Sequence, residues 1–211
     1  MSTKQPSKVA DLAQKQENSI VINAVKEPHY TNLHANEQDL ALVRDFEVTN
    51  YDEDFALEIS SAHALSFDLN TALDIYLNST VRLSEDKIDE ICTATFEAFS
   101  NALLWSNLEM PYALRDDIDN FNSLIRERAC SLLHGSRKIK VIIKSLGREI
   151  MVTVASQGLG FDIESMLNAN RPAFKGFEII KSLASRITHD DEGRILILHF
   201  ALEDKYNGSK K

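Results

Sequence analysis

The sequence predicts an α+β fold, a two-layer α/β sandwich in which a mainly antiparallel sheet carries helices on one face. Two kinds of periodicity support this class. Apolar residues alternate with polar ones over residues 54–60 and on both sides of Gly147, as they do in half-buried strands. Between these strands, residues 84–105 have apolar side chains at helical spacing. Helices therefore alternate with the strands of a mainly antiparallel sheet.

The first half of the domain is expected to begin with the strand 54–60 and to continue with a helix over 68–78. Ser84 is followed by two acidic residues, which suits a helix start because a serine cap and negative charges satisfy the exposed amide groups. This helix should run to about residue 105. After Pro111, a further helix is expected over 116–133, with Gly135 as its stop.

The second half is expected to form a hairpin that turns at Gly147, with a loop over 156–173. A helix should follow from Gly176 to about Ile187, and after the turn at Gly193 a last strand should cover 195–200. Residues 1–50 are treated as an N-terminal extension, with a mobile start and a short helix near 37–46. Residues 51–203 form the domain, and 204–211 form a polar tail.

Charge and composition exclude several classes of function. The chain of 211 residues has a formal charge of −9, so nucleic acids and anionic membranes are not expected as partners. No stretch is apolar enough to span a bilayer, and the polar start does not look like a secretory signal. The two cysteines fit reduced thiols better than a disulfide, and Cys92 should pack as a small buried residue. These features predict a cytoplasmic protein.

Two polar side chains, Glu97 and Asn101, lie one turn apart on the less apolar face of the helix 84–105. They are either ordinary surface residues or the floor of a pocket. Glycines are scarce, with seven in the chain, yet Gly158 and Gly160 stand together directly after the hairpin. Such a pair either serves a turn that needs positive φ or lets the backbone approach a ligand.

These segments together resemble the GHKL (Bergerat-fold) ATPases, specifically the anti-sigma-factor serine kinases. Residues 91–109 are similar to the family's N-box, in which Glu97, Ala98, Asn101 and Ala102 match the E-A-x-x-N-A core. Residues 156–162 resemble the first glycine box, although Ser156 replaces its leading aspartate. Gly176 matches the second glycine box, in which Phe174 replaces the first glycine. The resemblance covers residues 54–202 and implies the Bergerat (histidine-kinase-like ATPase) fold.

The resemblance also implies a role for each matched residue. Asn101 would be the Mg²⁺ contact because an amide oxygen suits this ion, and Glu97 would be the catalytic base. Gly158, Gly160 and Gly176 would hold ATP through backbone groups, with Lys175 adding a positive charge. Ser156 stands at the adenine-reading position. Trp105 stands where the family usually has histidine, and it either covers the pocket edge or simply packs.

The function implied is that of a cytosolic regulator in a partner-switching pathway. It would bind ATP and Mg²⁺ and would phosphorylate or sequester a protein partner, a sigma factor or its antagonist. A homodimer is expected, as is common in the family. The alternative, motivated by Ser156 and Phe174, is a catalytically inactive module of the same fold that recognises its partner through protein contacts and no longer binds nucleotide.

Overall fold

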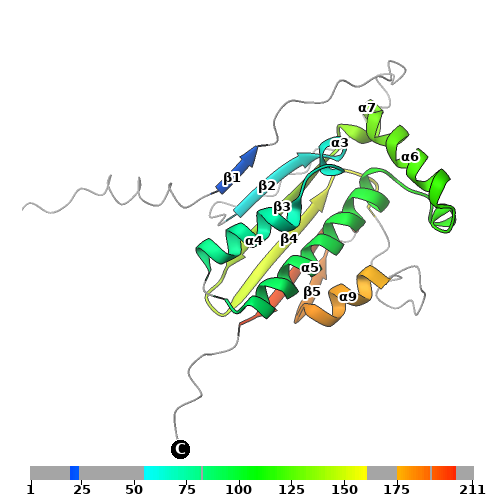
Figure 1. The fold of residues 1–211 in the computed structure, drawn as a ribbon. Coiled ribbons are helices and arrows are strands. Elements are labelled where there is room, and N and C mark those ends of the chain that lie inside the picture. Colours follow the sequence, from blue (N-terminus) through cyan, green and yellow to red (C-terminus); the bar gives the residue numbers. More distant parts are fainter. Residues whose placement is uncertain (1–19, 24–54, 82, 161–174, 191, 203–211) are drawn as a thin grey trace, which may run out of the picture.

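A computed structural model describes residues 20–23, 55–81, 83–160, 175–190 and 192–202 of the chain. Its strands form one sheet in the order β1-β2-β3-β4-β6-β5 (Figure 1). The strands are β1 (Ile20–Asn23), β2 (Phe55–Ser60), β3 (Lys138–Ser145), β4 (Glu149–Ser156), β5 (Arg186–His189) and β6 (Ile195–Ala201). Every neighbouring pair from β2 to β5 is antiparallel, so the predicted α+β class with a mainly antiparallel sheet is confirmed.

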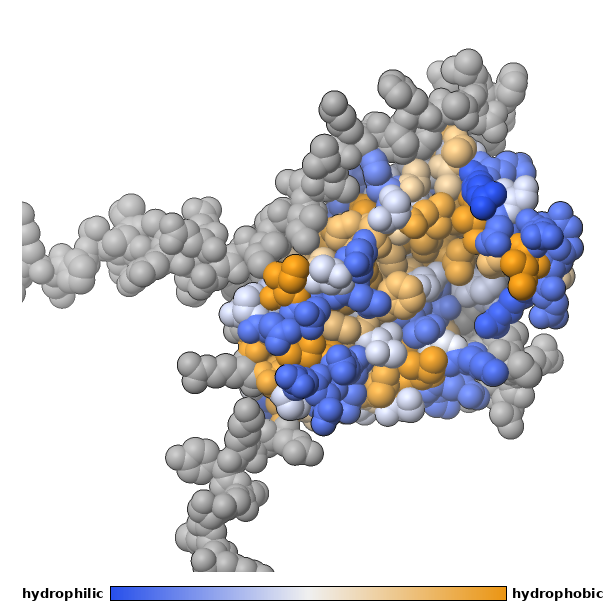
Figure 2. All heavy atoms as spheres, in the orientation of Figure 1, coloured by the Kyte–Doolittle hydropathy of each residue, from blue (hydrophilic) through white to orange (hydrophobic). Residues whose placement is uncertain are grey.

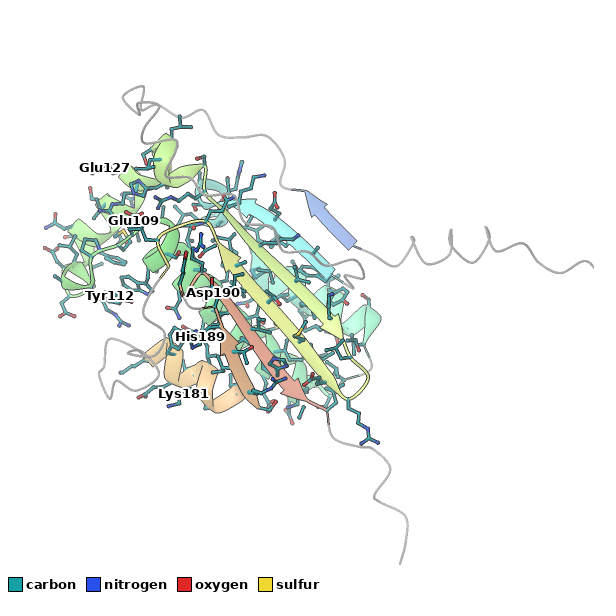
Figure 3. The ribbon with its side chains drawn as sticks, turned by 180° about the vertical axis from the view of Figure 1, so that it is seen from behind. Glu109, Tyr112, Glu127, Lys181, His189 and Asp190 are labelled. Carbon is teal, nitrogen blue, oxygen red and sulfur yellow. The ribbon has the colours of Figure 1, made fainter. Side chains whose placement is uncertain are left out.

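Helices cover one face of this sheet. In Figure 1 α4, α5 and α9 lie in front of the strands, and in Figure 3, seen from behind, the strands lie in front of these helices. The described helical segments are α3 (Ser61–Ala64), α4 (Leu69–Thr80), α5 (Glu85–Asn101), the π-helix η1 (Ala102–Asn107), the 3₁₀-helix η2 (Tyr112–Leu114), α6 (Ile118–Cys130), α7 (Leu132–Gly135) and α9 (Lys175–Leu183). None of them is both long and apolar enough to cross a membrane.

The core lies between the sheet and the helices. On β2 the residues Phe55, Leu57 and Ile59 are buried, and their partners across the β2–β3 ladder are buried isoleucines and a valine. Alternation thus places one apolar row of each strand against the helices. Figure 2 shows hydrophilic residues mixed with apolar ones over this helical face. Because α5 is packed between the sheet, α4 and α9, its buried side is wide and includes Ala94, Thr95 and Ala98.

Several predicted details are confirmed. Ser84 caps α5, since its hydroxyl accepts a hydrogen bond from the Lys87 amide at 3.3 Å. Gly147 and Gly193 have φ values of 79° and 66°, as their turns require. Cys92 is half-buried, and burial, together with the nearby Asp74 and Asp89, raises the pKa of its thiol to about 11. A thiol with this pKa is almost entirely protonated at neutral pH and is a poor nucleophile.

Three predicted elements differ from the structure. The helix expected to end at about residue 105 changes at Ala102 into the π-helix η1, and the helix expected over 116–133 is interrupted at Ser131. The helix expected to reach Ile187 ends at Leu183, so this prediction was wrong for its last turn. Residues 186–189 instead form β5, because pairing with β6 supplies backbone hydrogen bonds that outweigh the weak helical preference of a short segment.

One strand was not predicted at all. β1 comes from the segment treated as an N-terminal extension, and it pairs with β2 in parallel at the edge of the sheet. The predictions for the mobile start, the helix near 37–46, most of the loop 156–173, Phe174 and the tail 204–211 lie outside the described residues.

Candidate functional site

The structure brings Glu97, Asn101 and Gly176 together where α9 crosses α5. Gly176 is the second residue of α9, and a β-carbon added to it would lie 2.4 Å from Glu97 Oε2 and 3.7 Å from Asn101 Nδ2. Any other residue at position 176 would therefore push the Glu97 carboxylate aside. Glu97 and Asn101 are both partly buried, so they form the contact surface for the start of α9.

The carboxylate at this contact suits the start of a helix. The first amide groups of a helix have no partner within it and carry partial positive charge. Glu97 brings a negative charge to this position on α9. Lys175, the first residue of α9, is exposed and adds a positive charge beside it. A negative side chain therefore lies at the end of α9 where the helix dipole favours it, and α9 packs on the core through the burial of Phe177 and Ile180.

Asn101 uses its amide oxygen within the protein. Oδ1 accepts a hydrogen bond from the indole Nε1 of Trp105 at 3.0 Å. Its Nδ2 is buried and has no hydrogen-bond partner among the described residues. The side chain therefore presents a donor, and not its oxygen, to the space beside α9.

Trp105 belongs to an aromatic cluster at the end of α5. Its ring stacks on Tyr112, with centroids 4.3 Å apart and an interplanar angle of 15°, and it meets Phe121 at 6.1 Å. Burial raises the pKa of Tyr112 to about 12, so its hydroxyl is neutral at physiological pH. Tyr112 is labelled in Figure 3, on η2 near the end of η1. Trp105 packs here, which is one of the two roles that the sequence left open.

The loop after β4 that contains Gly158 and Gly160, called the glycine loop below, packs tightly against two other segments. A β-carbon at Gly158 would lie 1.9 Å from the backbone oxygen of Ser106, and one at Gly160 would lie 2.0 Å from the backbone oxygen of Glu192. Gly160 also has a φ of 77°, and its amide donates to Ser106 Oγ at 3.0 Å. Close backbone approach is thus the reason for glycine at both positions, and the partners are η1 and the β5–β6 turn.

Asp190 holds that turn in place. Its carboxylate accepts hydrogen bonds from the amides of Arg194 and Ile195 at 2.7 and 2.9 Å. Figure 3 labels Asp190 beside His189, at the end of β5. Gly160 in the glycine loop packs against Glu192 of this turn, so Asp190 holds in position one of the segments that the loop contacts.

Ser156 is buried, with 1% of its surface exposed. Its hydroxyl forms a hydrogen bond with Ser106 Oγ at 2.8 Å and also lies 3.3 Å from the backbone oxygen of Arg194. In this arrangement the hydroxyl is fully engaged by the protein. The structure does not bring Ser156 to the contact of Glu97, Asn101 and Gly176.

A buried polar network beneath the glycine loop was not predicted. Asn107 is fully buried, and its amide nitrogen donates to Ser61 Oγ at 2.9 Å and to the Lys138 carbonyl at 3.1 Å, while Oδ1 accepts from the Gln157 amide at 3.0 Å. All of its donors and its oxygen are therefore satisfied. Asn107 ties the end of η1 to three segments that are far apart in sequence.

The network continues to a charged cluster around Glu109, which is labelled in Figure 3. Arg137, 1% exposed, donates to the Asn107 carbonyl and to Glu109 Oε1, each at 2.6 Å, and His134 lies 3.6 Å from Glu109 Oε2. Burial alone would raise the pKa of Glu109, but hydrogen bonds and charge from His134 and Arg137 lower it below its usual value. Glu109 is the last residue of the N-box-like segment 91–109, but nothing in the sequence indicated that Arg137 would be its partner.

Comparison with known proteins adds no family to these observations: no protein-family model matches the chain, and neither does any curated protein. Fold and site together define an α+β protein in which two glycine-containing segments contact one long helix, Gly176 at Glu97 and Gly158 at Ser106.

Proposed function

We propose that this chain is a cytosolic regulatory protein of the GHKL (Bergerat) type, similar to the anti-sigma-factor serine kinases, and that it works by sequestering a protein partner. The observation that carries this proposal is that both glycine-containing segments contact the helix α5–η1, Gly176 at Glu97 and Gly158 at Ser106. The resemblance to the GHKL ATPases implies this arrangement, in which both glycine boxes lie beside the N-box helix. The partner would be a sigma factor or its antagonist in a partner-switching pathway, and the protein would act as a homodimer.

The described residues fit Mg²⁺ and ATP poorly. Mg²⁺ requires oxygen ligands, but Asn101 Oδ1 accepts a hydrogen bond from Trp105, and the Asn101 atom that lies near Gly176 is Nδ2. The Ser156 hydroxyl is buried and hydrogen-bonded to Ser106 Oγ and to the backbone oxygen of Arg194. We therefore favour sequestration through protein contacts, without a nucleotide-dependent step.

The serine kinase is the second candidate, and one observation favours it. Glu97 and Asn101, the residues that the resemblance assigns as base and Mg²⁺ contact, lie beside the same glycine, Gly176. A kinase would need the carboxylate charge of Glu97 as a base, whereas a sequestering module would use no proton transfer at Glu97. This difference makes Glu97→Gln the informative variant, because it keeps the shape of the side chain and removes its charge.

The experiment is to isolate the partner from the native organism and then to measure its binding to the purified full-length chain. We expect the same affinity, within about twofold, with Mg·ATP and with EDTA, and the same affinity for Glu97→Gln. The matched control is Asp89→Asn, which makes the same kind of change at an exposed position of α5. Transfer of labelled γ-phosphate to a partner serine is measured in parallel.

A partner that is phosphorylated by the wild type and not by Glu97→Gln would establish the kinase and contradict the nucleotide-independent version. Failure to retain a regulatory partner under either condition would contradict the proposal as a whole. Light scattering after size-exclusion chromatography tests the homodimer separately.

A further inference from the structure

Trp105 is held in a fixed position beside Asn101. Its ring is stacked on Tyr112 and packed near Phe121, and its single donor, Nε1, is bonded to Asn101 Oδ1. Indole nitrogen donates and does not accept. The Asn101 atom that faces Nε1 must therefore be a hydrogen-bond acceptor, and this atom is Oδ1.

The alternative orientation of the Asn101 amide is disfavoured by the same contact. Exchanging Oδ1 and Nδ2 would place two donors about 3 Å apart and would remove a partly buried hydrogen bond. In the observed orientation Nδ2 lies on the side of Gly176, where it has no partner among the described residues. A cation that approaches from α9 would meet amide hydrogens, which repel positive charge.

We propose that Trp105 is a positioning residue. Its hydrogen bond to Asn101 Oδ1 keeps this oxygen turned away from a divalent cation beside α9, and this is the specific reason why the site does not fit a Mg·nucleotide. The inference rests on the proposed GHKL-type site. It goes beyond it by naming the side chain that determines whether the site accepts a metal. Trp105 thus determines whether Asn101 can bind Mg²⁺, although Trp105 itself contacts neither the ion nor a nucleotide.

Calorimetry tests the consequence directly. Trp105→Phe keeps an aromatic ring in the cluster and removes the donor, so Asn101 becomes free to rotate. We expect the variant to bind Mg·ADP at least tenfold more tightly than the wild type, and both proteins to bind ADP in EDTA equally weakly. Adding Asn101→Ala to Trp105→Phe should abolish the gain. Phe121→Leu, which loosens the cluster and leaves the donor in place, is the matched control.

Nuclear magnetic resonance provides a readout that needs no nucleotide. Trp105 is the single tryptophan of the chain, so its indole N–H gives one resonance. Asn101→Ala should shift this resonance and speed its exchange with solvent about tenfold, whereas Asn78→Ala on α4 should leave it unchanged. In the wild type, 10 mM MgCl₂ should leave it unmoved.

The following results would overturn the inference: an indole resonance that is insensitive to Asn101→Ala, a wild type that binds Mg·ADP as tightly as Trp105→Phe, or no Mg·ADP binding by either protein. In the last case some other feature excludes the nucleotide, and the proposed sequestering function stands, because partner binding is measured separately. Loss of partner binding by the wild type would contradict the proposed function and leave the role of Trp105 intact.

Discussion

Individual glycines in this chain are required for different physical reasons. Gly147 has a φ of 79° with no atom within 4 Å of an added β-carbon, so only its backbone conformation favours glycine. Gly158 has no such φ, but an added β-carbon would lie 1.9 Å from a backbone oxygen of η1. A backbone cannot move aside as a flexible side chain can. The requirement at Gly158 is therefore steric and the requirement at Gly147 is conformational.

The two substitutions to alanine should separate these effects. Gly147→Ala should lower the free energy of unfolding by about 1 kcal/mol, the cost of a left-handed conformation. Gly158→Ala should lower it by about 3 kcal/mol, because the glycine loop must move away from Ser106. Urea denaturation of both variants checks the order. An equal loss for the two would mean that the loop yields easily and that its contact with η1 is loose.

At the scale of elements, the end of the long helix organises the polar interior. The π-helix η1 carries Asn107 into the network under the glycine loop, and Glu109, which follows it, has a φ of 50°. Positive φ is unfavourable for glutamate, so this conformation is held by its surroundings. The ion pair with buried Arg137 and the hydrogen bonds of Arg128 to the carbonyls of Leu108 and Glu109 supply that support.

Glu109→Gln tests this support. At pH 7 the variant should lose about 2 kcal/mol of unfolding free energy, less than for a fully buried pair because the Glu109 side chain is 26% exposed. The pKa of Glu109 is lowered in the folded state, so its charge contributes stability above the unfolded pKa, about 4.3, and this contribution is lost as the pH falls through the folded pKa.

The difference between wild type and Glu109→Gln should therefore shrink as denaturation is repeated from pH 5 toward pH 3. A difference that stays constant over this range would show that the carboxylate charge is not what stabilises the cluster.

The same elements show how far the sequence could predict the structure. Local sequence signals were enough to predict β2, the β3–β4 hairpin and the start of α5. The strands have complete alternating apolar patterns, and α5 has its own N-cap. It was not enough for β5, where a four-residue segment at the end of a helical pattern becomes a strand only through its pairing with β6. Long-range pairing of this kind has no local signal.

The candidate site divides in the same way. Spacing along the helix placed Glu97 and Asn101 on one face, and the glycine positions marked the two segments that contact it. The bond from Trp105 to Asn101 and the buried Arg137 could not be predicted, because each depends on which partner the folded chain brings within about 3 Å.

At the scale of the whole molecule, stability should be highest in the middle of the sheet. β3 and β4 have strands on both sides, whereas α9 is held by two buried side chains, Phe177 and Ile180, and by the contact with Glu97. Burial of two large apolar side chains contributes roughly 3–6 kcal/mol. The helix should therefore open locally without unfolding of the sheet.

Native-state hydrogen exchange measures this difference. Amides of β3 and β4 should exchange only by global unfolding, while amides of α9 should exchange at least tenfold faster. Glu97→Ala should accelerate the amides of α9 further and leave those of β3 unchanged. Equal protection of α9 and β3 would mean that the helix and the sheet unfold as one cooperative unit.

Among the residues that the structure describes, the outermost strands of the sheet are β1 and β5, which are four residues long, whereas the inner strands β3 and β4 have eight. An edge strand presents unpaired backbone groups on which another chain can add a strand. Four residues provide few such groups, so strand addition from a neighbouring molecule gains little from either edge. The taper of the sheet thus protects a chain with a strongly apolar interior against edge-to-edge aggregation.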